Sequence, residues 1–398
     1  MAQDSLPTFP TPPKAIIILG GSYGGISTAH YLLKHVVPRL PDSTSYQVIL
    51  ASAATQAMCR PACPRALISD DMFPQDKLFV NIREAFAQYS AGAFRFIHGH
   101  GHAEAGEPAT LTLSYHALVI ATGASTPALP RAKRIVIAGG GASGVETAGE
   151  LGEHLNGSGS KSRDKVDIVL VTGGAQILPG LRSSIAQKAE SYLARLGVTV
   201  QKNTRVKSVV VAGGDGGAEY DTERDVASAA VVTLADGAVI QADLYLPATG
   251  TRPNTGFLSP SLLAVDGRVE TNSATLRVDG AGPRVYAIGD AASWAQPAVH
   301  NILTSVPVLC ANAKRDLLLA AGKGGKPENG KVSASSTEDR VFKEDTREMQ
   351  MVPIGRSKGV GAAMGHRLPS FMVWMIKGRD YWLWSTKDLW NGKQWAKE

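Results

Sequence analysis

The sequence is poor in cysteine, in excess charge and in long apolar runs, and each shortage excludes a class of protein. With 3 Cys among 398 residues, a disulfide framework is excluded and a reducing compartment is expected. No apolar run approaches the roughly 18 residues of a membrane-spanning helix, so we predict none. The 41 Lys and Arg exceed the 35 Asp and Glu by only 6, without a basic block, which argues against nucleic-acid binding.

The first residues also lack targeting features. They read MAQDSLPTFPTPP, which resembles neither a secretory signal nor a mitochondrial presequence, so we expect a cytoplasmic protein. Ala2 follows Met1, whereas N-myristoylation needs glycine at that position, so no myristoyl group is expected. No cluster of His, Cys and Asp has the spacing of metal ligands, and no metal site is predicted.

Two glycine-rich turns are the strongest signals that are present. Each follows a short apolar strand and precedes residues with helical spacing, and each unit is followed further along by Ala-Thr-Gly. A turn of this kind brings helix N–H groups against a pyrophosphate, because small residues let the backbone approach closely. We therefore predict two dinucleotide-binding units in an α/β chain. The turns are Gly20-x-Ser22-x-x-Gly25 and Gly139-x-Gly141-x-x-Gly144.

The residues expected to meet the ribose are less regular. In such units the second strand ends in a carboxylate, but here the ends read Leu-Ala-Ser at 50–52 and Val-Thr-Gly at 171–173. We expect Ser52 or the backbone to compensate at the first site. At the second site, around Thr172, no carboxylate opposes a 2′-phosphate, but no Arg follows directly to bind one. The choice between NADH and NADPH stays open, and use of both is compatible with these residues.

Further motifs carry a family resemblance. PRAL at 64–67, ATGTRPN at 248–254, YAIGDAA at 286–292 and a tail with VPIGRSKGVG followed by IKGRDYW accompany the two turns. Together they resemble flavoproteins with two dinucleotide-binding domains, of the pyridine nucleotide-disulfide reductase fold. Within that fold the chain resembles the AMID or ferroptosis-suppressor group of apoptosis-inducing-factor-like proteins, which are similar in chemistry to type II NADH dehydrogenases.

The resemblance implies an α/β fold with two Rossmann-like domains and a small C-terminal α+β region. The NAD(P)H domain is then inserted into the FAD domain. The expected segments are 14–130 (FAD-binding domain, first part), 131–247 (NAD(P)H-binding domain), 248–321 (FAD-binding domain, second part), 322–348 (polar loop) and 349–398 (aromatic C-terminal region). In this scheme the crossing 124–133 is short, so either the linker is abbreviated or a segment is missing.

The resemblance also implies roles for four charged residues. Arg65 lies near FAD, Asp290 binds the ribityl and pyrophosphate part of FAD, Glu146 faces the nicotinamide, and Lys377 lies near the flavin. The residues alone admit simpler interpretations: a surface arginine, a helix N-cap, a first-turn carboxylate stabilised by the helix dipole, and a solvated tail charge. The predicted catalytic residues are Glu146 and Lys377, and the predicted cofactor-binding residues are Gly20, Gly21, Ser22, Gly24, Gly25, Ser52, Arg65, Thr122, Gly123, Gly139, Gly141, Gly144, Thr172, Gly250, Gly289 and Asp290.

Cys59 and Cys63 raise a competing hypothesis, in which a dithiol passes electrons from flavin to a disulfide substrate. Their C-x3-C spacing differs from the C-x4-C of the reductases and from the thioredoxin-type C-x-x-C. Pro61 and Pro64 would also disturb a helix that carries such a pair. We therefore favour a mechanism without these thiols.

Tryptophan is concentrated at the end of the chain. Of 6 Trp, all but Trp294 lie after residue 370, interleaved with Lys and Arg. Two interpretations stay open, and both can hold: peripheral contact with a membrane surface, or packing onto the flavin domain to wall the active site. A quinone-like acceptor would reach the flavin through such an aromatic surface.

These observations predict an FAD-dependent enzyme that moves electrons from NADH or NADPH to a quinone-like acceptor. A second hypothesis is a flavin-dependent tailoring oxidase of a small secondary metabolite. A third, from a different class, is an AIF-like signalling or DNA-binding flavoprotein with little turnover.

Overall fold

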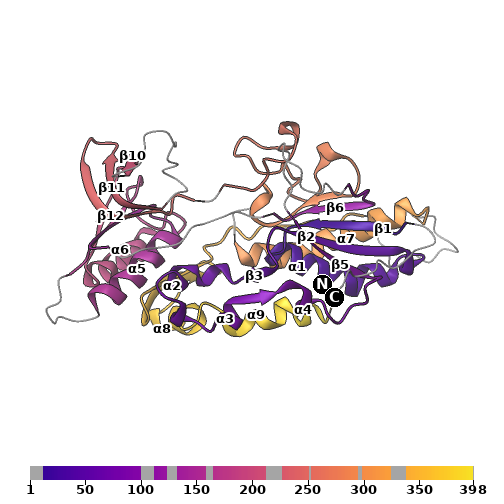
Figure 1. Cartoon of the computed structure of the whole chain (residues 1–398), viewed down its shortest axis with the longest axis horizontal. Coiled ribbons are helices and arrows are strands. Elements are labelled where there is room, and N and C mark those ends of the chain that lie inside the picture. Colours follow the sequence, from indigo (N-terminus) through magenta and orange to yellow (C-terminus); the bar gives the residue numbers. More distant parts are fainter. Residues whose placement is uncertain are drawn as a thin grey trace, which may run out of the picture.

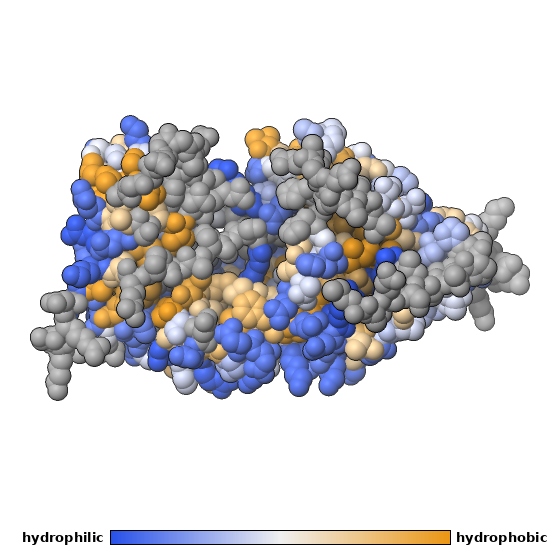
Figure 2. Space-filling model, in the orientation of Figure 1, coloured by the Kyte–Doolittle hydropathy of each residue, from blue (hydrophilic) through white to orange (hydrophobic). Residues whose placement is uncertain are grey.

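The protein has two lobes joined along one side by its C-terminal region (Figure 1). The computed structural model describes residues 12–99, 112–122, 132–157, 165–211, 226–250, 252–294, 298–323 and 338–397. In the space-filling view a notch separates the lobes along the upper edge (Figure 2). The C-terminal helices run along the opposite, lower edge and pass from one lobe to the other.

The first lobe is built on a five-stranded parallel sheet with the order β13-β6-β1-β2-β5. Its central strand, KAIIIL, is apolar throughout its middle, as expected for a strand that is covered on both faces. Helices α1 and α7 pack together against this sheet and share one hydrophobic core with it. The strands are β1 (Lys14–Leu19), β2 (Tyr46–Ser52), β5 (Phe94–His98), β6 (Ala117–Ile120) and β13 (Val285–Ala287).

The second lobe is built on a six-stranded sheet with the order β10-β11-β12-β7-β8-β9. Strands β12, β7, β8 and β9 run parallel, whereas β10, β11 and β12 form an antiparallel meander. In sequence the whole sheet lies between β6 and β13 of the first lobe, so one α/β unit is inserted into another. The strands are β7 (Arg134–Ala138), β8 (Asp167–Val171), β9 (Val198–Gln201), β10 (Val206–Val211), β11 (Ala227–Leu234) and β12 (Val239–Pro247).

The C-terminal region has its own small antiparallel sheet, which packs on helices α5 and α6 of the second lobe. The segment after this sheet then packs with residues of the first lobe. Its strands are β14 (Gln350–Ile354), β15 (Lys358–Ala363) and β16 (His366–Arg367), and a further pair is formed by β3 (Gln56–Met58) and β4 (Phe79–Asn81).

The helices differ widely in length. The long ones lie against the two large sheets, and most short ones line the lower edge of the molecule in Figure 1. They are α1 (Tyr23–Tyr31), α2 (Cys63–Ala66), α3 (Gln75–Leu78), α4 (Ile82–Ala85), α5 (Ala142–Asn156), α6 (Ser183–Arg195), α7 (Val299–Ala320), α8 (Ser370–Val373) and α9 (Leu383–Trp390).

The structure confirms the predicted α/β fold with parallel sheets. Helix α5 ends at Asn156, and Gly157 caps it with φ +73°. The short crossing after Thr122 and the central part of the predicted polar loop, 324–337, lie outside the described residues. Among the described residues, no helix is long and apolar enough to cross a membrane.

The tryptophans of the C-terminal region fall into two groups. Trp390 and Trp395 are buried in the core of the first lobe, and the Trp390 ring lies 4.7 Å from that of Tyr23. Trp374 and Trp384 are 37% and 62% exposed. Of the two interpretations from sequence, the buried pair therefore agrees with packing onto the rest of the protein, in the core of the first lobe.

This division gives a matched test of stability. Replacing Trp390 with alanine should lower the free energy of unfolding by about 3–5 kcal/mol, because a large cavity is left in the core. The exposed Trp384, six residues earlier on the same helix, should tolerate the same change with less than about 0.5 kcal/mol of loss. Urea unfolding of both variants checks this, and equal losses would contradict the packing described.

Candidate functional site

The two glycine-rich turns have nearly the same geometry. Gly20 and Gly139 have φ of +114° and +125°, and a Cβ on either would lie 2.1 Å from the carbonyl oxygen of the strand alongside. A Cβ on Gly25 or Gly144 would lie 1.8 Å or 1.9 Å from the carbonyl of the first glycine of its own turn. Only glycine fits at these positions, because each turn is closed tightly against its neighbouring strand.

Both turns lead into helix N-termini that are open to an anion. Ser22, the N-cap residue of α1, makes no side-chain capping hydrogen bond, and Gly141, the N-cap residue of α5, has no side chain to make one. Neither helix has an acidic residue in its first turn. An added Cβ on Gly141 would meet no atom within 4 Å, so there is free space over that turn. Unpaired N–H groups, the positive end of the helix dipole and this space fit a pyrophosphate.

The hydroxyl residues that end the second strands lie directly beside the turns. A Cβ on Gly21 would be 2.7 Å from Ser52 Oγ, and one on Gly140 would be 2.5 Å from Thr172 Oγ1. The structure therefore places Ser52, the expected ribose partner, and Thr172, a predicted cofactor-binding residue, in equivalent positions beside the two turns.

The first turn also meets the Gly-Asp motif near the end of β13. A Cβ on Gly24 would be 3.3 Å from the Ile288 side chain, which immediately precedes Gly289 and Asp290. Burial raises the pKa of Asp290, and Arg60 partly offsets that effect. Asp290 also lies in a 3₁₀ turn, η8 (Gly289–Ala291), rather than at the N-cap of a long helix.

Two other predicted residues, Thr122 and Gly250, lie just after strands β6 and β12 and are not part of the glycine-rich turns. Thr122 donates its hydroxyl to the carbonyl of Asn254 at 2.8 Å, and Asn254 donates to the carbonyl of Thr122 at 3.1 Å. Gly250 has φ +123° and is exposed, with no atom near an added Cβ. Gly123 lies outside the described residues.

Glu146 and Lys377 form a buried ion pair. Lys377 Nζ donates to Glu146 Oε1 at 2.5 Å and to the carbonyl of Met351 at 3.1 Å, and the two side chains are 4% and 10% exposed. Burial raises the pKa of Glu146 to about 7, although Lys377 acts to lower it. Glu146 lies beyond the first turn of α5. The structure therefore contradicts both simpler interpretations, in which Glu146 is a first-turn carboxylate and Lys377 is a solvated tail charge.

A second buried pair lies one helical turn further along α5. Arg65 Nε and Nη2 donate to the two carboxylate oxygens of Glu150 at 2.9 Å and 2.7 Å, and Tyr381 Oη donates to Glu150 Oε1 at 3.0 Å. Arg65 Nη1 also donates to the carbonyl of Arg379. Arg65, predicted to lie near the cofactor, therefore bridges three segments of the chain, and it is not a surface arginine. Sequence reasoning singled out neither Glu150 nor Tyr381.

The segment that carries Lys377 is held in an unusual backbone conformation. Tyr381 and Trp382 both have positive φ, of +52° and +67°, which side-chain-bearing residues rarely adopt. Their rings face Lys377 Nζ with centroids at 5.6 Å and 5.4 Å. Such strain persists only where the surrounding contacts determine the conformation, and it marks functional sites more often than other places.

The cysteines do not form a redox pair in this structure. Cys59 and Cys63 are free thiols; Cys59 accepts a hydrogen bond from Tyr23 Oη, and Cys63 contacts Met58 Sδ. Burial raises the pKa of Cys59 and raises that of Cys63 to about 11. Both thiols are protonated at neutral pH, whereas a dithiol mechanism needs a thiolate.

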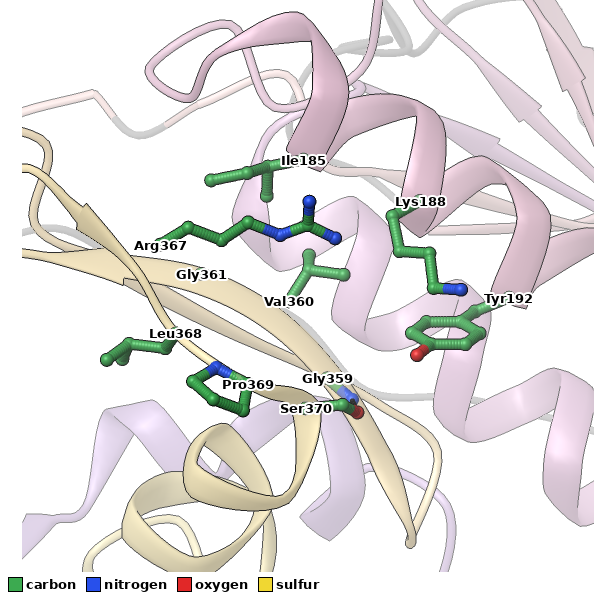
Figure 3. Close-up of a pocket in the computed structure, with 10 residues that line it drawn as sticks. All are labelled: Ile185, Lys188, Tyr192, Gly359, Val360, Gly361, Arg367, Leu368, Pro369 and Ser370. Carbon is green, nitrogen blue, oxygen red and sulfur yellow. Dashed lines mark hydrogen bonds between the residues drawn. The ribbon is translucent and has the colours of Figure 1, made fainter.

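A cavity of about 300 Å³ lies elsewhere, between α6 and the C-terminal sheet (Figure 3). Lys188 and Tyr192 approach it from α6, and Val360 and Arg367 from the strands opposite. None of the residues predicted for the site lines it. It is therefore separate from the two glycine-rich turns.

Comparison with known proteins assigns the family. Residues 127–315 match the family model described as pyridine nucleotide-disulphide oxidoreductase. Oxidoreductase phnG of Penicillium herquei is 56% identical over 97% of this chain and 98% of its own length. This chain belongs to the pyridine nucleotide-disulphide oxidoreductase family. Its members are oxidoreductases that bind FAD and NAD(P)H, and the two turns fit those nucleotides.

More distant relatives share the fold. Ferroptosis suppressor protein 1 of Xenopus tropicalis is 27% identical over 63% of this chain and 59% of its own length. The crystal structure of reduced CoADR-RHD from Bacillus anthracis aligns with a TM-score of 0.55 and 18% identity, covering 87% of this chain. This chain spans 61% of that protein's length, and the likeness shows the fold alone.

The buried Arg65–Glu150 pair generates a test. Replacing Arg65 with leucine should cost about 3–5 kcal/mol of unfolding free energy, because Glu150 is left charged and unpaired in the interior. Replacing Glu150 with leucine as well should recover part of that loss. The control is Arg134→Leu. Arg134 and Asp167 form an ion pair whose side chains are 49% and 45% exposed, so we expect it to contribute less than about 1 kcal/mol to the unfolding free energy. Urea unfolding measures all three, and a small loss in Arg65→Leu would contradict a bridging role.

Proposed function

We propose that the protein is an FAD-dependent NAD(P)H oxidoreductase that reduces a quinone-like acceptor. The observation that supports this most directly is the buried Glu146–Lys377 pair. It lies two residues after Gly144 of the second turn, and it is completed by a segment from the C-terminal region. We assign FAD to the turn at Gly20–Gly25 and NAD(P)H to the turn at Gly139–Gly144.

The bound flavin supplies the redox chemistry, accepting a hydride from the nicotinamide and giving up two electrons to the acceptor. The chain supplies orientation and protons. A hydroquinone forms from a quinone by uptake of two electrons and two protons; one proton enters with the hydride of the nicotinamide and one must come from elsewhere. Glu146, with its pKa raised to about 7, holds a proton that it can release near neutral pH. Lys377 Nζ donates a hydrogen bond to the same carboxyl and so carries further protons directly beside it.

The aromatic C-terminal region supports an apolar acceptor. Trp382 borders Lys377, and Phe371, Met375 and Trp384 are 65%, 50% and 62% exposed on the segment that carries it. We infer from this surface, and from the likeness to ferroptosis suppressor protein 1, that the chain belongs to the ferroptosis-suppressor-like group. The same exposed side chains would make peripheral contact with a membrane surface, from which a quinone-like acceptor partitions.

A second candidate is a flavin-dependent oxidase that modifies a small secondary metabolite. It is favoured by the 56% identity with a fungal oxidoreductase, which is about twice the identity with ferroptosis suppressor protein 1. This enzyme would use the same cofactors but a different acceptor, so the acceptor assay below separates the two.

The test is an anaerobic titration of the FAD-loaded protein with NADH and with NADPH. We expect the flavin absorbance to be bleached by at least one nucleotide and restored faster by a soluble quinone than by oxygen. The Cys63→Ser variant should behave like the natural chain, because the thiol is protonated and takes no part. Absence of bleaching would refute the proposal. A large loss of quinone reduction in Cys63→Ser would restore the dithiol hypothesis.

The pKa of Glu146 predicts a pH dependence. Below about pH 7 the carboxyl is protonated and can supply a proton, and above that pH it is not. Quinone reduction should therefore fall about tenfold per pH unit above this value, provided proton transfer limits the rate. Glu146→Gln should remove the inflection, whereas Glu190→Gln, on α6, should keep it. Stopped-flow rates from pH 5.5 to about 9 measure this, and an unchanged profile in Glu146→Gln would contradict the assignment.

A further inference from the structure

The second strand of the NAD(P)H unit ends in an unusual way. Strand β8 is followed by Thr172, Gly173 and Gly174, so no carboxylate stands where it would bind the ribose 2′-hydroxyl of NADH. Gly173 is exposed and directly follows Thr172, the residue that lies beside the glycine-rich turn. The end of β8 itself therefore carries no negative charge that would oppose a 2′-phosphate.

An arginine from a different loop fills the space above this glycine. A Cβ added to Gly173 would lie 2.4 Å from Arg205 Nε, 2.8 Å from its Cγ and 3.1 Å from its Cδ. Any other residue at Gly173 would displace the arginine side chain. Glycine is thus what allows Arg205 to lie across the end of β8.

The backbone holds the Arg205 loop in register with the end of β8. Thr204 donates its N–H to the carbonyl of Thr172 at 3.2 Å, and Asn203 donates to the carbonyl of Gly174 at 3.1 Å. The carbonyl of Arg205 itself accepts from Ala235 at 2.8 Å. The position of Arg205 is therefore set by main-chain contacts on both sides.

No described residue neutralises the charge of Arg205. Within the described part of the chain, no hydrogen bond or ion pair is made by its side chain, which is exposed. The neighbouring cation Lys202, by contrast, pairs with Glu190 at 3.1 Å. A guanidinium that has no partner among the described residues, and that lies across the end of β8, has the charge and the planar donor set that suit a phosphate monoester.

We propose that Arg205 binds the 2′-phosphate of NADPH and makes the protein prefer NADPH to NADH. This rests on the proposed use of NAD(P)H as electron donor and names which of the two we expect the protein to prefer. Gly173 acts with Arg205: it provides the space for the arginine and omits the carboxylate that would repel the phosphate.

The first experiment measures binding without turnover. Isothermal calorimetry of the FAD-loaded protein should show adenosine 2′,5′-bisphosphate binding at least about tenfold more tightly than adenosine 5′-phosphate. Arg205→Ala should bring the two affinities to within about twofold while leaving that of adenosine 5′-phosphate unchanged. Lys207→Ala, which removes an exposed cation two residues away, should keep the difference.

A second variant changes the preference in the opposite direction. Gly173→Asp both displaces Arg205 and adds a carboxylate, so the ratio of kcat/KM for NADPH to that for NADH should fall at least about tenfold below the natural value. The proposal is overturned if the natural chain does not distinguish the two adenosine phosphates, or if Arg205→Ala weakens both equally. Because fragment binding needs neither flavin reduction nor an acceptor, this result is independent of whether quinone reduction is observed.

Discussion

Two carboxylates buried one turn apart on a single helix impose the main constraint on this structure. Glu146 and Glu150 both face the interior from α5, and neither charge is tolerated there without a partner. One cation comes from the first lobe as Arg65 and the other from the C-terminal region as Lys377. Three segments distant in sequence must therefore meet at α5, and the candidate site is the place where they meet.

The two nucleotide units show how one backbone design serves two ligands. Their glycine turns are closed by the same carbonyl contacts, and a hydroxyl residue lies beside each turn in the same place. What differs is what surrounds each turn. The first turn lies against Ile288, which precedes Gly289 and Asp290 after β13. The second turn is followed by the buried ion pair of α5, and the strand beside it, β8, leads to Gly173 and Arg205. Specificity thus comes from neighbouring segments, because the turns themselves are nearly interchangeable.

The fold and the two turns were predictable because their signals are local. Gly20 and Gly139 each follow an apolar strand, and the backbone conformation there admits glycine alone. Glu146 and Lys377 were chosen by resemblance, and the structure brings them into contact. The partners of Glu150 and the position of Arg205 could not be predicted, since they depend on which loops meet in space. The four-residue spacing of Glu146 and Glu150 was the one available signal, because it places both on one helical face.

Because the C-terminal region joins the two lobes, it affects how the chain folds during synthesis. Lys377 and Tyr381 are synthesised long after α5, yet they provide a charge and a hydroxyl that α5 requires. While the ribosome still covers those residues, the inserted unit has an interior carboxylate without its cation. Each unit begins to fold as it emerges, but α5 cannot be fully neutralised before the segment with Lys377 has emerged. A stop codon before Lys377 would therefore leave the inserted unit as well as the C-terminal region exposed to proteolysis.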